Sequence, residues 1–161
     1  MSKFCLISRK QMMKTVTLFS DGSCLNNPGA GGWAYILEFN GAVKKDSGGA
    51  AMTTNNQMEL TAVIEGLKAL KEPCEVRLFT DSSYVANAVN SWLDGWVKKN
   101  FIGSDKKPVK NIELWQEYLR VSRPHKVTAS WIKAHNGHPQ NEECDTMARE
   151  KATKFQNEAD I

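Results

Sequence analysis

Two short segments of the chain share one order of residues: an apolar stretch, a hydroxyl side chain and then an aspartate. They are residues 18–21, with the sequence LFSD, and residues 78–81, with the sequence LFTD. Apolar stretches of this kind that end at turn-forming residues are typical of buried strands. If the two strands are parallel neighbours, about 4.8 Å apart, Asp21 and Asp81 lie at the same edge of a sheet. Such a pair restricts the chain to folds that contain a parallel component.

The sequence around these segments predicts five strands. Residues 15–21 predict a first strand that ends at Asp21-Gly22, and residues 33–39 and 42–50 flank Asn40-Gly41, which favours a two-residue hairpin turn. The first three strands are therefore expected to form an antiparallel meander. The other two strands are expected at residues 76–83 and 126–133, separated by helical segments, which indicates parallel pairing. The predicted fold is α/β, with a five-stranded mixed sheet flanked by helices.

Four helices are expected between and after the strands. The first begins at the capping box of residues 54–57, TNNQ, continues with apolar residues at helical spacing and closes before Pro73. The others are predicted at residues 82–93, capped by Ser82 or Ser83, then from Pro108 onward, and at residues 141–155.

Length and composition indicate one ordinary globular unit. A chain of 161 residues, 41% hydrophobic and 24% charged, fits a single domain, which we place at residues 14–161. Residues 1–13 match no element, and we expect a disordered tail or an upstream start there. No window approaches the roughly 20 apolar residues of a membrane span. The opening has no signal core and the four cysteines lie far apart, so we expect a cytoplasmic protein with reduced thiols. We also expect a monomer.

Positive charge is concentrated in one segment. The chain has 21 basic and 18 acidic residues, a net charge of +3, and residues 96–111 alone carry five lysines against one aspartate, a net charge of +4. Trp92, Trp96 and Phe101 interleave with these lysines, as on surfaces that bind nucleic acid. A solvated lysine-rich loop is the commoner explanation of such a run by itself, and the aromatic residues could equally anchor the segment to the core.

Two further acids extend the pair of strand-end aspartates. Glu59 and Asp145 fall at the borders of the apolar faces of the first and last predicted helices, where each would face the margin of the sheet. Four carboxylates at one edge would repel one another and are difficult to keep ionised without cations. Oxygen ligands with no cysteine or histidine cluster nearby select Mg²⁺ or Mn²⁺, and a pair of such ions supports phosphodiester hydrolysis.

Each of these residues also has an ordinary structural interpretation. A strand-end aspartate is often a turn or cap residue, Glu59 suits a helix dipole and Asp145 could be an ordinary surface acid. The loop at residues 133–139, KAHNGHP, places His135 before the fourth acid. A loop histidine often has no function, but one near the acids could transfer a proton or help to release product phosphate.

Five motifs in the same order resemble the bacterial type 1 ribonuclease H family. They are FSDGSCLNNPGAGGWA, TTNNQMEL, FTDSSYV, DGWVKKN with DKKPVKNIELW, and WIKAHNGHPQNEECDTMAR. The similarity runs from about residue 14 to 152, nearly the whole chain. It implies cleavage of the RNA strand of RNA·DNA hybrids with Mg²⁺, or Mn²⁺ as a substitute, which leaves 5′-phosphate and 3′-hydroxyl ends. Asp21, Glu59, Asp81 and Asp145 match the family's metal-binding acids, and His135 its loop histidine.

The resemblance also implies a set of substrate contacts. Residues in the positions of minor-groove contacts are Cys24, Asn27, Asn55 and Asn56, whose amides suit the wide, shallow groove of a hybrid. Thr54 and Asn111 match positions that hold a phosphate of the DNA strand. The segment that matches the family's basic handle includes Trp92, Trp96, Lys98, Lys99, Lys106 and Lys107. The two tryptophans match aromatic anchors, and a core role fits them at least as well as stacking.

The sequence departs from the family at two substrate positions. Met52 stands where many relatives have arginine, and Ser83 replaces a glutamine of familiar bacterial relatives. Neither touches the acids, so affinity is more in question than activity. Two other functions are compatible with a fold of this kind: a non-catalytic nucleic-acid-binding module and a related phosphodiesterase. A binding module without catalysis should have lost at least one acid, and the basic segment with its asparagine cluster argues against a junction resolvase or integrase core.

Overall fold

The structure, a computed structural model, describes residues 13–134 and 137–159. Within them lies one five-stranded sheet in the order β3-β2-β1-β4-β5. The strands are β1 Lys14–Cys24, β2 Gly29–Phe39, β3 Ala42–Thr53, β4 Cys74–Thr80 and β5 Lys126–Trp131. The first three form an antiparallel meander, and β4 and β5 continue the sheet in parallel with β1. The predicted mixed sheet is confirmed.

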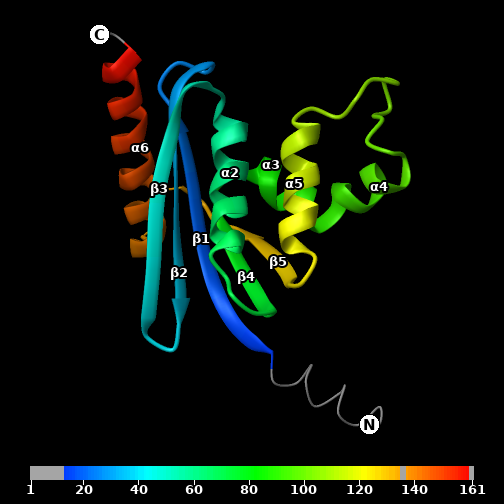
Figure 1. The fold of residues 1–161 in the computed structure, drawn as a ribbon, viewed down its shortest axis with the longest axis horizontal. Helices are drawn as coiled ribbons and strands as arrows, with labels where there is room; N and C mark the ends of the chain where they lie inside the picture. The colour runs from blue at the N-terminus through cyan, green and yellow to red at the C-terminus, as the bar shows by residue number, and fades with distance from the viewer. Residues whose placement is uncertain (1–12, 135–136, 160–161) are drawn as a thin grey trace.

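Helices lie on both faces of this sheet (Figure 1). They are α2 Asn55–Lys68, α3 Ser83–Asn87, the π-helical turn η1 Ala88–Trp92, α4 Leu93–Lys98, α5 Ile112–Ser122 and α6 Pro139–Ala159. Helix α6 covers one face of the meander, whereas α2 packs on the opposite face with α5 beside it. Helix α4 and the loop after it project away from the sheet. None of the helices in the described part of the chain is long and apolar enough to span a bilayer.

Alternation along β1 explains the two layers of the core. Val16 and Leu18 join the larger cluster, which contains the buried residues of α2 and Trp115 of α5. Phe19 points into the smaller cluster with Cys144 and Ala148 of α6. Because successive strand residues face opposite sides of a sheet, one strand supports both layers.

Several predicted boundaries are wrong. Strands β4 and β5 end at Thr80 and Trp131 and not at residues 83 and 133, β2 begins at Gly29, β3 extends to Thr53, and the helix predicted at residues 82–93 continues through η1 and α4 to Lys98. Three other differences have a clear local reason. Strand β1 continues beyond Asp21 because Gly22, Ser23 and Cys24 still pair with β2. Helix α5 begins at Ile112 and not at Pro108: Pro108 bridges to Ile102, and the left-handed backbone of Asn111 (φ 61°) interrupts any earlier helix. Helix α6 begins at Pro139, because proline suits the first turn. The hairpin turn at Asn40-Gly41 has the expected positive φ angles, 46° and 82°.

Candidate active site

Strand register brings the two repeated aspartates together. The parallel ladder between β1 and β4 ends at the pair Ser20 and Thr80, so Asp21 and Asp81 are the next residues of neighbouring strands. Both hydroxyl residues are fully buried, and the Thr80 hydroxyl accepts a hydrogen bond from the Ser82 amide (3.0 Å). Ligands bind beyond the carboxyl ends of parallel strands in open sheets, and the aspartates lie at this end.

Helix α2 brings the third acid to the same point. Its first turn is fixed by Thr54, whose hydroxyl accepts a hydrogen bond from the backbone N–H of Gln57 (3.2 Å), as the capping motif predicts. The helix passes so close to β1 that a Cβ atom on Gly22 would lie 2.4 Å from the Glu59 nitrogen. Only glycine permits this approach, which places the Glu59 carboxylate beside that of Asp21.

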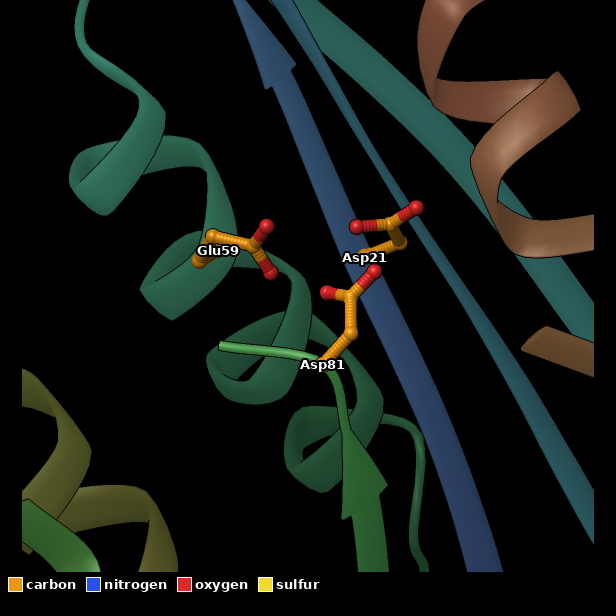
Figure 2. Close-up of side chains that lie close together, drawn as sticks. All are labelled: Asp21, Glu59 and Asp81. Atoms are coloured by element: carbon orange, nitrogen blue, oxygen red, sulfur yellow. The ribbon is translucent and has the colours of Figure 1, made fainter. Parts of the chain in front are cut away.

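The carboxylates of Asp21, Glu59 and Asp81 point toward one another (Figure 2). One oxygen from each lies within 4.8 Å of the others. Asp21 is only 2% exposed; its Oδ1 accepts a hydrogen bond from the Gly22 amide (2.9 Å), whereas its Oδ2 and the Oε2 of Glu59 are buried without a hydrogen-bond partner among the described residues. Buried polar atoms are rarely left unsatisfied, so these oxygens are suited to a ligand.

Electrostatics at the site favour a bound cation. Burial, and next the charge of Asp81, raise the pKa of the Asp21 carboxyl to about 8. Burial and the neighbouring acids also raise the pKa of Glu59 well above its ordinary value. The cost of keeping these groups ionised is removed when a divalent cation sits between them, and an all-carboxylate donor set fits a hard ion. The residues present therefore fit a divalent metal site.

Asp145 lies on the rim of this cluster and is not one of the three closest carboxylates. It lines the same hollow as Asp21, Glu59 and Asp81, but its Oδ2 forms an ion pair with Arg149 one turn along α6 (2.9 Å). The other sequence-predicted residue of the catalytic set, His135, falls outside the described residues.

The predicted groove residues surround the first turn of α2. Cys24, Asn55 and Asn56 line the same hollow as the acids. The Cys24 thiol contacts backbone oxygens, the nearest being that of Thr53 at 3.4 Å. The Oδ1 of Asn27 accepts a hydrogen bond from the backbone N–H of Asn55 (3.1 Å), so Asn27 stabilises the start of the helix. Asn55 and Asn56 are exposed and free to meet a ligand.

We call residues 88–111 the basic protrusion. Its aromatic residues face inward: the ring centroids of Trp92 and Trp96 lie 6.0 Å apart, Trp96 lies 5.6 Å from the buried Trp115, and Tyr84 completes the cluster. Trp92 keeps 43% of its surface exposed. The lysines at 98, 99, 106 and 107 are all exposed. The aromatic cluster anchors the protrusion, and the lysines remain available to a partner.

Two residues near the site were missed by sequence reasoning. In the sequence, Gln57 is only the last residue of the capping box, and Tyr84 only falls within the helix predicted at residues 82–93. In the structure the Nε2 of Gln57 donates a hydrogen bond to Asn111 (3.4 Å), and the Tyr84 hydroxyl lies at the wall of the hollow, where it accepts one from Asn111 (3.2 Å). Spacing along the chain carries no signal for these contacts, because each joins residues 27 or more apart.

A mixed sheet with carboxylates on the neighbouring strands β1 and β4, where their parallel ladder ends, and a third acid from the adjacent helix fits the class of metal-dependent nucleases of α/β architecture. The family model described as RNase H matches residues 13–153. Ribonuclease H of Campylobacter concisus is 71% identical over 149 residues, which cover 92% of this chain and 100% of the relative. Ribonuclease HI of Campylobacter jejuni is 57% identical over 148 residues, 92% of this chain and 98% of the relative.

The solved structures agree with this match. The structure of LC9-RNase H1, described as a type 1 RNase H with the type 2 active-site motif, has a TM-score of 0.78 and 27% identity, and the match covers 89% of this chain and 74% of that one. The chain belongs to the RNase H family. Its activity is accordingly that family's hydrolysis of the RNA strand of an RNA·DNA hybrid.

Proposed function

We propose that this chain cleaves the RNA strand with Mg²⁺ held by Asp21, Glu59, Asp81 and Asp145, and that it releases 5′-phosphate and 3′-hydroxyl ends. The observation that carries the proposal is the group of three carboxylates within 4.8 Å of one another, two of them with a buried oxygen that lacks a hydrogen-bond partner among the described residues. Asp21 lies close to both Glu59 and Asp81, and the resemblance to the family makes it the ligand that the cations would share. When bound, the cations supply a nucleophilic water and stabilise the leaving oxygen.

The remaining acid and the loop histidine complete the proposed mechanism. Asp145 would join the ligands once its carboxylate is released from Arg149, whose own side chain is 59% exposed and can turn into solvent. His135 precedes α6, the helix that carries Asp145, and near neutral pH its imidazole can accept and donate a proton as product leaves. Mn²⁺ is expected to substitute for Mg²⁺, since both prefer oxygen ligands.

Substrate contacts are proposed on both sides of the acids. Cys24, Asn27, Asn55 and Asn56 read the minor groove, where amides can meet 2′-hydroxyl groups, and Thr54 with Asn111 holds a phosphate of the DNA strand. The four lysines of the basic protrusion contact phosphates, while Trp92 offers its exposed surface to the strand and Trp96 anchors the segment. We propose that residues 14–161 act as one monomeric domain in the cytoplasm, with residues 1–13 as an extension.

A cleavage assay with three substrates tests this proposal. Labelled RNA·DNA hybrid, duplex DNA and duplex RNA are each incubated with the protein and Mg²⁺, Mn²⁺ or a chelator. We expect only the hybrid to be cut, only with metal, and its RNA fragments to carry 5′-phosphate. Cleavage in the chelator, or fragments with 3′-phosphate, would contradict the proposed mechanism. Cleavage of duplex DNA would favour a nuclease of the resolvase type.

A further inference from the structure

A chain of hydrogen bonds links the first turn of α2 to the end of the basic protrusion. The Thr53 hydroxyl donates to the Oε1 of Gln57 (2.9 Å), and the Nε2 of Gln57 donates to the Oδ1 of Asn111 (3.4 Å). The Nδ2 of Asn111 then donates to the hydroxyl of Tyr84 (3.2 Å). That hydroxyl also accepts a hydrogen bond from the indole Nε1 of Trp115 (2.8 Å). The chain of hydrogen bonds therefore links β3, α2, α3 and α5, and the Asn111 carboxamide joins its α2 half to its α3 half.

The side chain of Gln57 departs from its expected local role. In a capping box, the residue at this position turns back to the backbone amide of the cap residue. Here Thr54 does cap the helix through the backbone N–H of Gln57. The side-chain amide of Gln57 instead donates a hydrogen bond to Asn111, 54 residues further along the chain. A local stabilising contact is thus replaced by one between α2 and the residue at which the protrusion rejoins the core.

The backbone conformation of Asn111 makes its hydrogen bonds to Gln57 and Tyr84 important for the orientation of its side chain. Its φ of 61° is left-handed, a conformation that asparagine tolerates better than most residues, and its side chain does not cap α5. The carboxamide is therefore oriented by its partners, Gln57 on its oxygen and Tyr84 on one N–H. A primary amide has two N–H groups, so one N–H remains for a phosphate oxygen.

We propose that Gln57 and Tyr84 are positioning residues, which hold the Asn111 carboxamide ready for a phosphate and so raise the affinity for the hybrid. The inference rests on the proposed contact between Asn111 and phosphate. Holding the amide before the substrate arrives reduces the ordering cost of binding. The hydrogen bonds of Gln57 and Tyr84 described here converge on Asn111, so we expect the effect on hybrid binding, with the chemical step unchanged.

Gln57→Met provides the cleaner test, because methionine is similar in length and forms no comparable hydrogen bond. We expect the KM for hybrid to rise about three- to tenfold, with kcat within about twofold of the parent. Gln116→Met, an exposed glutamine on α5, is the matched control and should change neither constant. Tyr84→Phe should also raise KM, but it leaves the buried Trp115 N–H without its acceptor and should lower the melting temperature as well.

A double-mutant cycle separates positioning from a merely structural role. Asn111→Gly removes the carboxamide but tolerates the left-handed backbone, and it should raise KM by itself. If Gln57 acts through Asn111, Gln57→Met should change KM by less than about twofold in the Asn111→Gly background. An equal rise in both backgrounds, or no rise in the parent, would overturn the positioning role. An unchanged KM for Asn111→Gly alone would overturn the proposed phosphate contact, and the positioning role with it.

Discussion

The acid cluster and the basic protrusion are built in opposite ways. Asp21 and Asp81 continue two paired strands, the neighbouring α2 is held in contact through Gly22, and the polar atoms there are buried. The protrusion is exposed, and of the five non-glycine residues with positive φ in the described part of the chain, four lie within it: Asn100, Phe101, Lys106 and Asn111. It begins with a π-helical turn and is anchored by aromatic rings that pack against one another at tilted angles.

This difference separates two tasks of the enzyme. Close carboxylates with raised pKa values bind a cation strongly and must be held rigidly, which a parallel ladder achieves. Exposed lysines gain affinity from counterion release and need only reach the phosphate backbone. Changes in the acid cluster should therefore alter turnover, and changes in the protrusion should alter affinity.

The largest effect is expected from Asp21→Asn. Removing one charge from the proposed shared ligand should lower kcat at least about a thousandfold, because the site would hold its cations weakly and the cations would no longer activate the attacking water. Affinity for the hybrid, measured by fluorescence anisotropy in a chelator, should stay within about twofold of the parent. Asp94→Asn, an exposed aspartate on α4, serves as the control and should retain full turnover. Substantial residual turnover would remove Asp21 from the mechanism.

The acid cluster should also make the stability of the metal-free protein depend on pH. Asp21 has a pKa of 3.8 in an unfolded chain and about 8 in the folded one. Between these values the folded state holds a proton that the unfolded state has lost, so stability falls as pH rises, by up to about 1.4 kcal/mol per pH unit. Chemical denaturation between about pH 5.5 and 7.5 should show this loss in the parent and a smaller one in Asp21→Asn.

Magnesium should weaken this dependence of stability on pH. A cation that binds the ionised carboxylates stabilises the folded state, so the parent should lose less stability with pH when Mg²⁺ is added. Asp21→Asn should respond weakly to the same addition. If the parent has the same pH slope with and without Mg²⁺, the three carboxylates do not share a cation.

The sequence was informative where structure depends on local pattern. The repeated LFSD and LFTD segments predicted the pairing of Asp21 and Asp81, because parallel strands place matching residues side by side. Asn40-Gly41 predicted the hairpin for a similar reason, since the turn requires positive φ. Both features are set by a few adjacent residues.

Other features depend on distances between distant parts of the chain. The approach of α2 to Gly22 is decided by the packing of a helix on a strand, and Gly22 alone reads as a turn residue. The diversion of Gln57 from its cap to Asn111 requires α5 to lie beside α2, which no spacing reveals. For Asp145, the position on the last helix predicts a place beside the other acids, whereas its ion pair with Arg149 is a local feature that follows from the spacing of four residues on one helix.

In contrast to the acid cluster, the lysines of the basic protrusion should affect the affinity for the hybrid. Changing Lys98, Lys99, Lys106 and Lys107 to alanine should weaken hybrid binding roughly tenfold or more at moderate salt. The slope of log affinity against log salt should become shallower by about 0.9 for each lysine that contacts a phosphate. Under saturating hybrid, kcat should stay within about twofold of the parent.

Lysines at the opposite end of the sheet provide the matched control. Lys14, Lys44 and Lys71 surround one pocket there, and Lys126 begins the neighbouring strand β5. Replacing these four with alanine changes the net charge equally, so the salt slope should remain that of the parent. Equal effects of the two quadruple variants would mean that total charge, and not the protrusion, governs binding.

The smallest effect is expected at Met52, near the end of β3. Its side chain is 72% exposed and it stands two residues before Thr54, at the position where many relatives resembling this chain have arginine. An exposed charge pair contributes about 0.2–1 kcal/mol, so Met52→Arg should lower KM by at most about fivefold and leave kcat unchanged. Met52→Gln, which adds polarity without charge, should have no such effect. A lower KM that persists in about 0.5 M salt would contradict a screened phosphate contact, because exposed charges at that ionic strength interact weakly.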